Sequence, residues 1–133
     1  MASVRREVRI DRPPELVWAT LGDPGTIHEW FPGIVASTVD DGVRTVTLGS
    51  GVTLAEDIVT IDPVLRRFQY RITGGLFRHH LGTVDVLDLH DGTCMAVYST
   101  DAEPDVMALV IGGASGAALH ELKRQFDSGE RSA

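Results

Sequence analysis

The sequence predicts an α+β protein in which a seven-stranded, bent antiparallel sheet surrounds a long C-terminal helix. Three observations support this prediction. Proline and glycine divide residues 13–33 into two short helical segments. Residues 34–100 contain six short runs of strand-type residues separated by turn residues. A periodic apolar stretch then follows Pro104 and continues to about residue 126. The expected order of elements is β-α-α-β-β-β-β-β-β-α.

The N-terminal third supplies the first strand and both short helices. Residues 4–10 alternate apolar and charged side chains, which is typical of an edge strand. The prolines at 13–14 suit the first turn of a helix, where a missing N–H costs nothing, and Gly22 ends that helix. Residues 23–24, Asp-Pro, predict an N-cap and the start of a second short helix. The Pro-Gly pair at 32–33 ends it.

The remaining strands are predicted over residues 34–39, 43–48, 52–61, 68–73, 82–89 and 93–100. Two of their connections, at 40–42 and 90–92, are short turns with glycine available for a positive φ. Short turns make consecutive strands antiparallel neighbours, so these six strands should form a meander. The loops at 49–51 and 74–80 are the glycine-rich connections of this part.

The last helix contains three glycines, at 112, 113 and 116, each costing about 1 kcal/mol relative to alanine. Either a close approach to the sheet or to a ligand, or a kinked helix, would explain them. The side chains expected to face the sheet are Val110, Ala114, Ala117, Ala118, Leu122 and Phe126.

Length, charge and cysteine content limit the classes of protein to which this chain can belong. The 133 residues suit a single domain spanning 1–133, and the formal charge of −7 argues against nucleic-acid binding. Cys94 is the only cysteine, which excludes an internal disulfide and suits a reducing compartment. No signal peptide or membrane-spanning run is evident. We expect a cytoplasmic protein without membrane insertion, either a monomer or a weak homodimer.

Three segments carry a resemblance to a known family. Residues 18–32 read W-x-x-L-G-D-P-x-x-I-x-x-W-x-P, residues 54–62 read L-A-E-D-I-V-T-I-D, and residues 119–123 read L-H-E-L-K. With the order of elements, they resemble the START-like (SRPBCC) superfamily, and within it the polyketide cyclase/dehydrase-type and MxaD-like group, over residues 4–126. The resemblance implies a helix-grip fold. It also implies a cavity between sheet and C-terminal helix that binds lipids, polyketides, hormones or other apolar molecules.

A second likeness is to the plant abscisic-acid receptors of the same superfamily. Residues 49–52 stand in the place of their gate loop, Glu56 in that of an inward glutamate, and residues 74–79 in that of their latch loop. Those receptors hold the hormone carboxylate with a lysine on an early strand, and residues 34–48 contain no lysine. Recognition of that hormone is therefore not implied.

Glu56 is the strongest candidate for a polar contact with the ligand. Alternation with period two places one set of side chains on a common face, which the resemblance favours as the cavity side: Val52, Leu54, Glu56, Ile58 and Thr60, with Phe68, Tyr70 and Ile72 on the next strand. A buried carboxylate must be paired or have a raised pKa. Contact with a ligand and a structural ion pair with Arg44 or Arg71 both satisfy this requirement.

The predicted ligand-binding residues are Trp30, Phe31, Leu54, Glu56, Tyr70, Phe77, His80, Tyr98 and Ser115. The orientation of Tyr98 is open, because 94-96-98 and 95-97 are both plausible inward sets. Adjacent histidines on a strand point to opposite faces, so of the pair at 79–80 only His80 should enter the cavity. We expect no metal site and no cofactor, because no metal-ligand spacing or phosphate-binding motif is present.

Three functions fit these observations. The first is non-catalytic binding of a small hydrophobic molecule such as a lipid or polyketide. The second is a polyketide aromatase/cyclase or dehydratase that uses Glu56 with Tyr70 or His80 as proton-transfer groups. The third is a lipid or quinone chaperone that acts through a protein partner. The absence of a nucleophile constellation favours the first.

Overall fold

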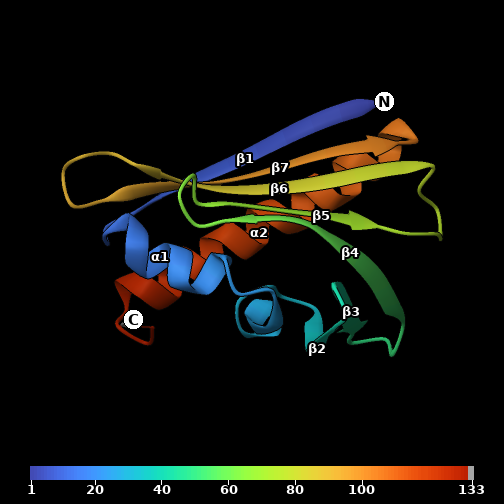
Figure 1. The fold of residues 1–133 in the computed structure, drawn as a ribbon, viewed down its shortest axis with the longest axis horizontal. Helices are drawn as coiled ribbons and strands as arrows, with labels where there is room; N and C mark the ends of the chain where they lie inside the picture. Colours follow the sequence, from blue (N-terminus) through green and yellow to red (C-terminus); the bar gives the residue numbers. More distant parts are fainter. Residues whose placement is uncertain (132–133) are drawn as a thin grey trace.

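The computed structural model describes residues 1–131 and follows the expected order of elements (Figure 1). The elements are β1 (Ala2–Ile10), α1 (Pro14–Leu21), the 3₁₀ helix η1 (Pro24–Glu29), β2 (Ile34–Asp40), β3 (Val43–Leu48), β4 (Thr53–Asp62), β5 (Arg67–Ile72), β6 (His79–Asp88), β7 (Cys94–Glu103) and α2 (Asp105–Asp127). The strands form one open antiparallel sheet in the order β1-β7-β6-β5-β4-β3-β2. The six later strands are a meander, and β1 pairs with the last of them. The predicted helix-grip architecture is confirmed.

The sheet bends along β4, so that β3 and β2 turn away from the plane of the other strands (Figure 1). Helix α2 packs mainly on β1 and β7, while η1 contacts β2 and β3. Large buried side chains fill the space between sheet and helix, among them Phe68, Tyr98, Leu119, Leu122 and Phe126. None of the helices within residues 1–131 is long and apolar enough to cross a membrane.

The inward face of α2 differs from the predicted one in its N-terminal half. Val110, Ala114 and Ala117 are exposed, whereas Ala118, Leu122 and Phe126 are buried as expected. The residues that face the sheet from this half and the middle are Ala108, Gly112, Ser115 and Leu119. The helix is turned so that Gly112 and Ser115 meet the strands.

A close approach to β1 explains Gly112, whereas a methyl group on Gly116 would make only ordinary contact with the Arg6 side chain. A methyl group on Gly112 would lie 2.6 Å from Cγ1 of Val4, and one on Gly116 would lie 3.4 Å from Cδ of Arg6. Gly113 has no neighbour within 4 Å at that position. Because α2 is a single helix from Asp105 to Asp127, contact with the sheet rather than a break in the helix accounts for Gly112.

A β-bulge corrects the predicted face of β4. The register with β5 shifts between Ile58 and Thr60, which moves Thr60 to the outer face, where its Oγ1 donates to Oε1 of Gln69 at 2.9 Å. Val52 precedes the strand and is exposed. The residues of the predicted set that face the core are Leu54, Glu56 and Ile58.

The structure also answers three smaller questions about β6, β7 and the tryptophans. Strand β6 begins at His79 rather than at 82, so both adjacent histidines lie on a strand and the preceding loop is shorter than predicted. On β7 the inward set contains Tyr98, which settles its orientation. Trp30 is more deeply buried than Trp18, because η1 packs its C-terminal end against the sheet.

Candidate functional site

A cavity of about 280 Å³ lies between the η1 segment, the inner face of the bent sheet and the middle of α2. Most of its wall is apolar, formed by Ile27, Phe31, Pro32, Ile34, Val46, Leu48, Leu54, Ile72, Ile111 and Ala114. Three polar side chains complete it: Glu56, Tyr70 and Tyr98. The 49–51 turn follows Leu48 directly, so the predicted gate loop stands beside this wall.

Glu56 forms a buried ion pair with Arg44. The two residues face each other on β4 and β3, and Nε of Arg44 donates to Oε1 of Glu56 at 2.6 Å. Arg44 also donates from Nη1 to the backbone carbonyl of Pro24 at 3.2 Å. Burial raises the pKa of Glu56, and the guanidinium opposes that shift. The alternative of a structural partner for Glu56 is therefore correct, with Arg44 as the partner, while Glu56 still reaches the cavity.

Aromatic rings hold the guanidinium in place. Its Cζ lies 5.1 Å from the ring centre of Phe68 and 4.9 Å from that of Tyr70, which adds cation–π attraction to the ion pair. A guanidinium held by these two neighbouring rings and by its hydrogen bonds leaves the Glu56 carboxylate in a defined orientation. The second oxygen of that carboxylate, Oε2, accepts no hydrogen bond from any of residues 1–131.

The phenol oxygens of Tyr70 and Tyr98 share a hydrogen bond beside the cavity. Gly82 makes room for this pair, since a methyl group there would lie 2.5 Å from the Tyr70 ring. Burial raises the pKa of Tyr98 to about 12 and that of Tyr70 well above its usual value. Both side chains are therefore neutral hydrogen-bonding groups at physiological pH.

His80 lies behind the cavity wall as a buried neutral side chain. The backbone N–H of Ile72 donates to its Nδ1 at 3.0 Å, so the ring carries its hydrogen on Nε2. Burial lowers the pKa of His80 to about 4. Rings of Tyr70 and Phe77 pack against it at centroid distances of 5.3 and 5.1 Å.

A family model described as polyketide cyclase / dehydrase and lipid transport matches residues 1–127. The chain belongs to this family. The family match agrees with an apolar cavity enclosed between a bent sheet and a C-terminal helix. The comparison with curated proteins finds no match.

Solved structures share the fold of this polyketide cyclase/dehydrase family member. XoxI from Bacillus cereus is 24% identical with a TM-score of 0.91, over 98% of this chain and 99% of its own. Norcoclaurine synthase from Thalictrum flavum, in complex with dopamine and hydroxybenzaldehyde, is 16% identical with a TM-score of 0.73, over 92% of this chain and 84% of its own. The di-domain aromatase/cyclase BexL is 17% identical with a TM-score of 0.79, over 93% of this chain and 46% of its own.

The structure divides the predicted ligand-binding residues into two groups. Five line the cavity: Phe31, Leu54, Glu56, Tyr70 and Tyr98. Four lie outside its wall: Trp30, Phe77, His80 and Ser115. Ser115 is fully buried on α2; it lies near enough to Tyr98 to lower the pKa of that phenol, yet its Oγ completes no hydrogen bond with residues 1–131. Contact between these nine residues and a ligand stays a prediction.

Sequence reasoning missed part of the site. Arg44 was considered only as a partner for Glu56, although it also binds η1 and stacks on two aromatic rings. Ile111 lines the cavity from α2 although it was not among the side chains expected to face the sheet, whereas Ala114 was among them and also lines the cavity. The signal for Arg44 was its alternation with Val46 on β3, which marks it as an inward residue.

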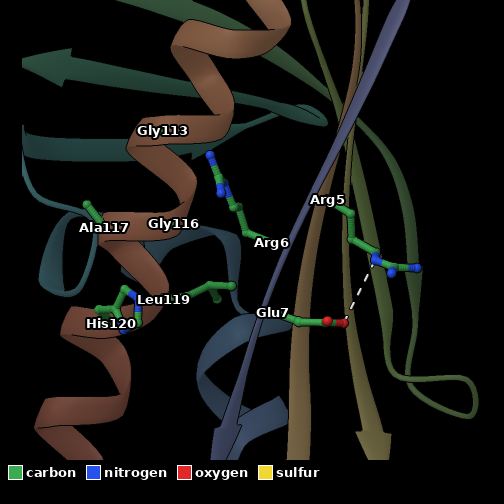
Figure 2. Close-up of a pocket in the computed structure, with 8 residues that line it drawn as sticks. All are labelled: Arg5, Arg6, Glu7, Gly113, Gly116, Ala117, Leu119 and His120. Atoms are coloured by element: carbon green, nitrogen blue, oxygen red, sulfur yellow. Dashed lines mark ion pairs between the residues drawn. The ribbon is translucent and has the colours of Figure 1, made fainter.

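A second, larger groove of about 480 Å³ lies on the surface between β1 and α2 (Figure 2). Arg6 extends from β1 toward α2 and donates from Nε to the carbonyl of Gly112 at 3.1 Å. Arg5 and Glu7 point to the other side of the strand and form an exposed ion pair at 3.8 Å (Figure 2). Both arginines of this groove make contacts within the chain, so the apolar cavity is the better candidate for binding an apolar ligand.

Proposed function

We propose that this protein reversibly binds a small, neutral and mostly apolar molecule in the cavity between sheet and C-terminal helix. The observation that carries the proposal is the 280 Å³ space with an apolar wall and only Glu56, Tyr70 and Tyr98 as polar groups. A few fixed polar groups in an apolar wall are typical of small-molecule sites, where burial supplies affinity and the polar groups supply orientation.

The size of the cavity favours a compact ligand. It lies just below the range of about 300–1,000 Å³ that is usual for drug-sized molecules. A molecule with one or two rings suits this space better than a long acyl chain or a full-length polyketide. The structurally similar norcoclaurine synthase, in complex with the single-ring molecules dopamine and hydroxybenzaldehyde, supports this range of sizes.

The charges favour a neutral ligand that carries a hydrogen-bond donor. Arg44 neutralises Glu56, so a ligand carboxylate would meet the Glu56 charge without a free cation beside it. A ligand cation would compete with Arg44 for the same carboxylate. A hydroxyl group can instead donate to Oε2 of Glu56 or exchange hydrogen bonds with the tyrosine pair.

A matched set of bicyclic probes tests this proposal: 2-naphthol, naphthalene and 2-naphthoate, by calorimetry and by thermal unfolding. We expect 2-naphthol to bind most tightly, and at 100 times its Kd to add about 2.7 kcal/mol to the free energy of unfolding. Glu56→Gln should remove much of the preference for the hydroxyl group. Equal or stronger binding of 2-naphthoate, or no binding of any neutral probe, would count against the proposal.

A second candidate function is proton-transfer catalysis on a carbonyl compound, favoured by the presence of Glu56 and Tyr70 on the same cavity wall. Glu56 would remove a proton next to the carbonyl, and the Tyr70 phenol would donate a hydrogen bond to the carbonyl oxygen. His80 is less suited because its Nδ1 is bonded to the Ile72 backbone and its ring lies behind the wall.

The two candidates separate by experiment with Glu56→Gln and Tyr70→Phe. Catalysis predicts that each substitution lowers turnover of ketone probes by about 100-fold or more, while affinity for 2-naphthol changes far less. A carrier predicts no turnover by the unaltered protein that exceeds the background reaction.

A further inference from the structure

A second, very small void lies beside the ligand cavity, between η1 and the inner face of the sheet. Trp30 and Arg44 contribute to its wall, and it shares Ile27, Tyr70 and Tyr98 with the cavity. These three shared side chains therefore separate the two spaces. The void leaves about 10 Å³ for the centre of a water molecule, so it has room for a single water molecule.

Two buried hydrogen-bond donors on this wall have no partner among residues 1–131. They are Nε1 of Trp30 and Nη2 of Arg44, on side chains that are 4% and 2% exposed. The other two guanidinium nitrogens of Arg44 are bonded to Glu56 and to the Pro24 carbonyl. Buried polar groups are nearly always satisfied by protein or by ordered water, so a pair of orphaned donors at one void indicates an occupant.

The chemistry of the wall limits what that occupant can be. Both orphaned groups can only donate, so the occupant must accept hydrogen bonds. The ion pair with Glu56 already balances the charge of Arg44, which favours a neutral molecule over an anion. Tyr70 and Tyr98 line the same void and offer phenol oxygens that can accept hydrogens in turn.

We propose that the void binds one ordered water molecule, which accepts hydrogen bonds from Nε1 of Trp30 and from Nη2 of Arg44. With this water, every guanidinium nitrogen of Arg44 has a partner. The guanidinium then joins three places: Glu56 on the cavity wall, Pro24 at the start of η1, and Trp30 just after its end. The water is thus part of the support that fixes η1 and the Glu56 carboxylate relative to each other.

The two tryptophans provide the test, with the half-buried Trp18 as the internal control for Trp30. In the ¹⁵N-labelled full chain, the two indole N–H signals are assigned with Trp18→Phe and Trp30→Phe. Transfer of magnetisation from water is then recorded in the laboratory frame and in the rotating frame. A long-lived bound water gives transfers of opposite sign in the two experiments, whereas chemical exchange with the solvent gives the same sign in both.

We expect transfer of opposite sign at the Trp30 indole and only exchange-type transfer at Trp18. A Trp30 signal without transfer from water at any temperature between 5 and 40 °C would show a dry void and overturn the proposal. A Trp30 signal that shifts with chloride concentration but not with sulfate would identify a bound halide and would also overturn it. Neither result depends on whether naphthol binds, so the outcome is separate from that of the proposed function.

Discussion

Replacing Gly112 by alanine would place a methyl group where Val4 of β1 already lies. The new Cβ would be 2.6 Å from Cγ1 and 3.2 Å from Cβ of Val4, so the strand or the helix must shift. Overpacking of this kind costs about 1–3 kcal/mol, and the better helix propensity of alanine returns about 1 kcal/mol. We expect the free energy of unfolding to fall by as much as about 2 kcal/mol.

Gly113 is the matched control, because it lies one position further along the same helix with no neighbour within 4 Å. Gly113→Ala should raise the free energy of unfolding by about 1 kcal/mol through helix propensity alone. Urea denaturation followed by circular dichroism measures both variants. The two should differ by about 1–3 kcal/mol, the size of the overpacking cost.

A double substitution tests the cause. Val4→Ala removes Cγ1, the atom that the Gly112→Ala methyl group would strike most closely. The pair should therefore be more stable than the sum of the two single effects, whereas Val4→Ala and Gly113→Ala should be additive. If Gly112→Ala is as stable as Gly113→Ala, or if both pairs are additive, the close approach of α2 to β1 does not explain Gly112.

Three further substitutions test the cavity and its support. Arg44→Met leaves the buried Glu56 charge unpaired and should lower the free energy of unfolding, measured by urea denaturation, by about 3–5 kcal/mol. The double variant with Glu56→Leu should regain most of that stability, and a double variant as unstable as Arg44→Met would contradict the ion-pair argument. Ala114→Phe should block the cavity and abolish 2-naphthol binding in calorimetry. The control Ala117→Phe, at an exposed helix position outside the cavity, should leave that binding unchanged. If both variants lose binding to the same extent, the ligand does not bind in this cavity. His80 is protonated near pH 6.5 in the unfolded chain and only near pH 4 in the folded chain. Lowering the pH from 6.5 to 4 should therefore reduce the free energy of unfolding by at most about 3 kcal/mol. His80→Asn should make the free energy of unfolding depend less on pH between 7 and 4.5; an unchanged pH dependence would show that other groups cause it.

The order of elements could be predicted because each depends on neighbours in the chain. Asp23 accepts a hydrogen bond from the Gly25 N–H at 3.1 Å and begins η1, and the glycine turns at 42 and 92 adopt the positive φ expected of hairpins. Alternating residues in β1 and β5 show which side chains are buried. These signals act over a few residues, so they are present in the sequence itself.

The candidate site was predicted less completely because it depends on contacts between distant segments. Glu56 and the two tyrosines were found, since a carboxylate or phenol in an apolar strand face is conspicuous. The rotation of α2 about its own axis, by contrast, places Gly112 against Val4 of β1. These two residues are too far apart in the sequence for any local pattern to contain both. The bulge after Ile58 also moves Thr60 to the other face of the sheet, and nothing in the sequence around Thr60 indicates this bulge.

By itself, then, the sequence determined the α+β class, the meander of strands and the long C-terminal helix, because local backbone preferences and period-two burial specify these features. Alternation grouped Glu56 with apolar neighbours, and the family resemblance indicated that this face points inward. Only the tertiary structure decided that Arg44 neutralises Glu56, that the cavity has a volume of about 280 Å³, and that Trp30 and Arg44, which carry orphaned donors, line one void. Those features arise where η1, β3, β7 and α2 meet, and the distances between segments far apart in the chain are fixed by packing alone.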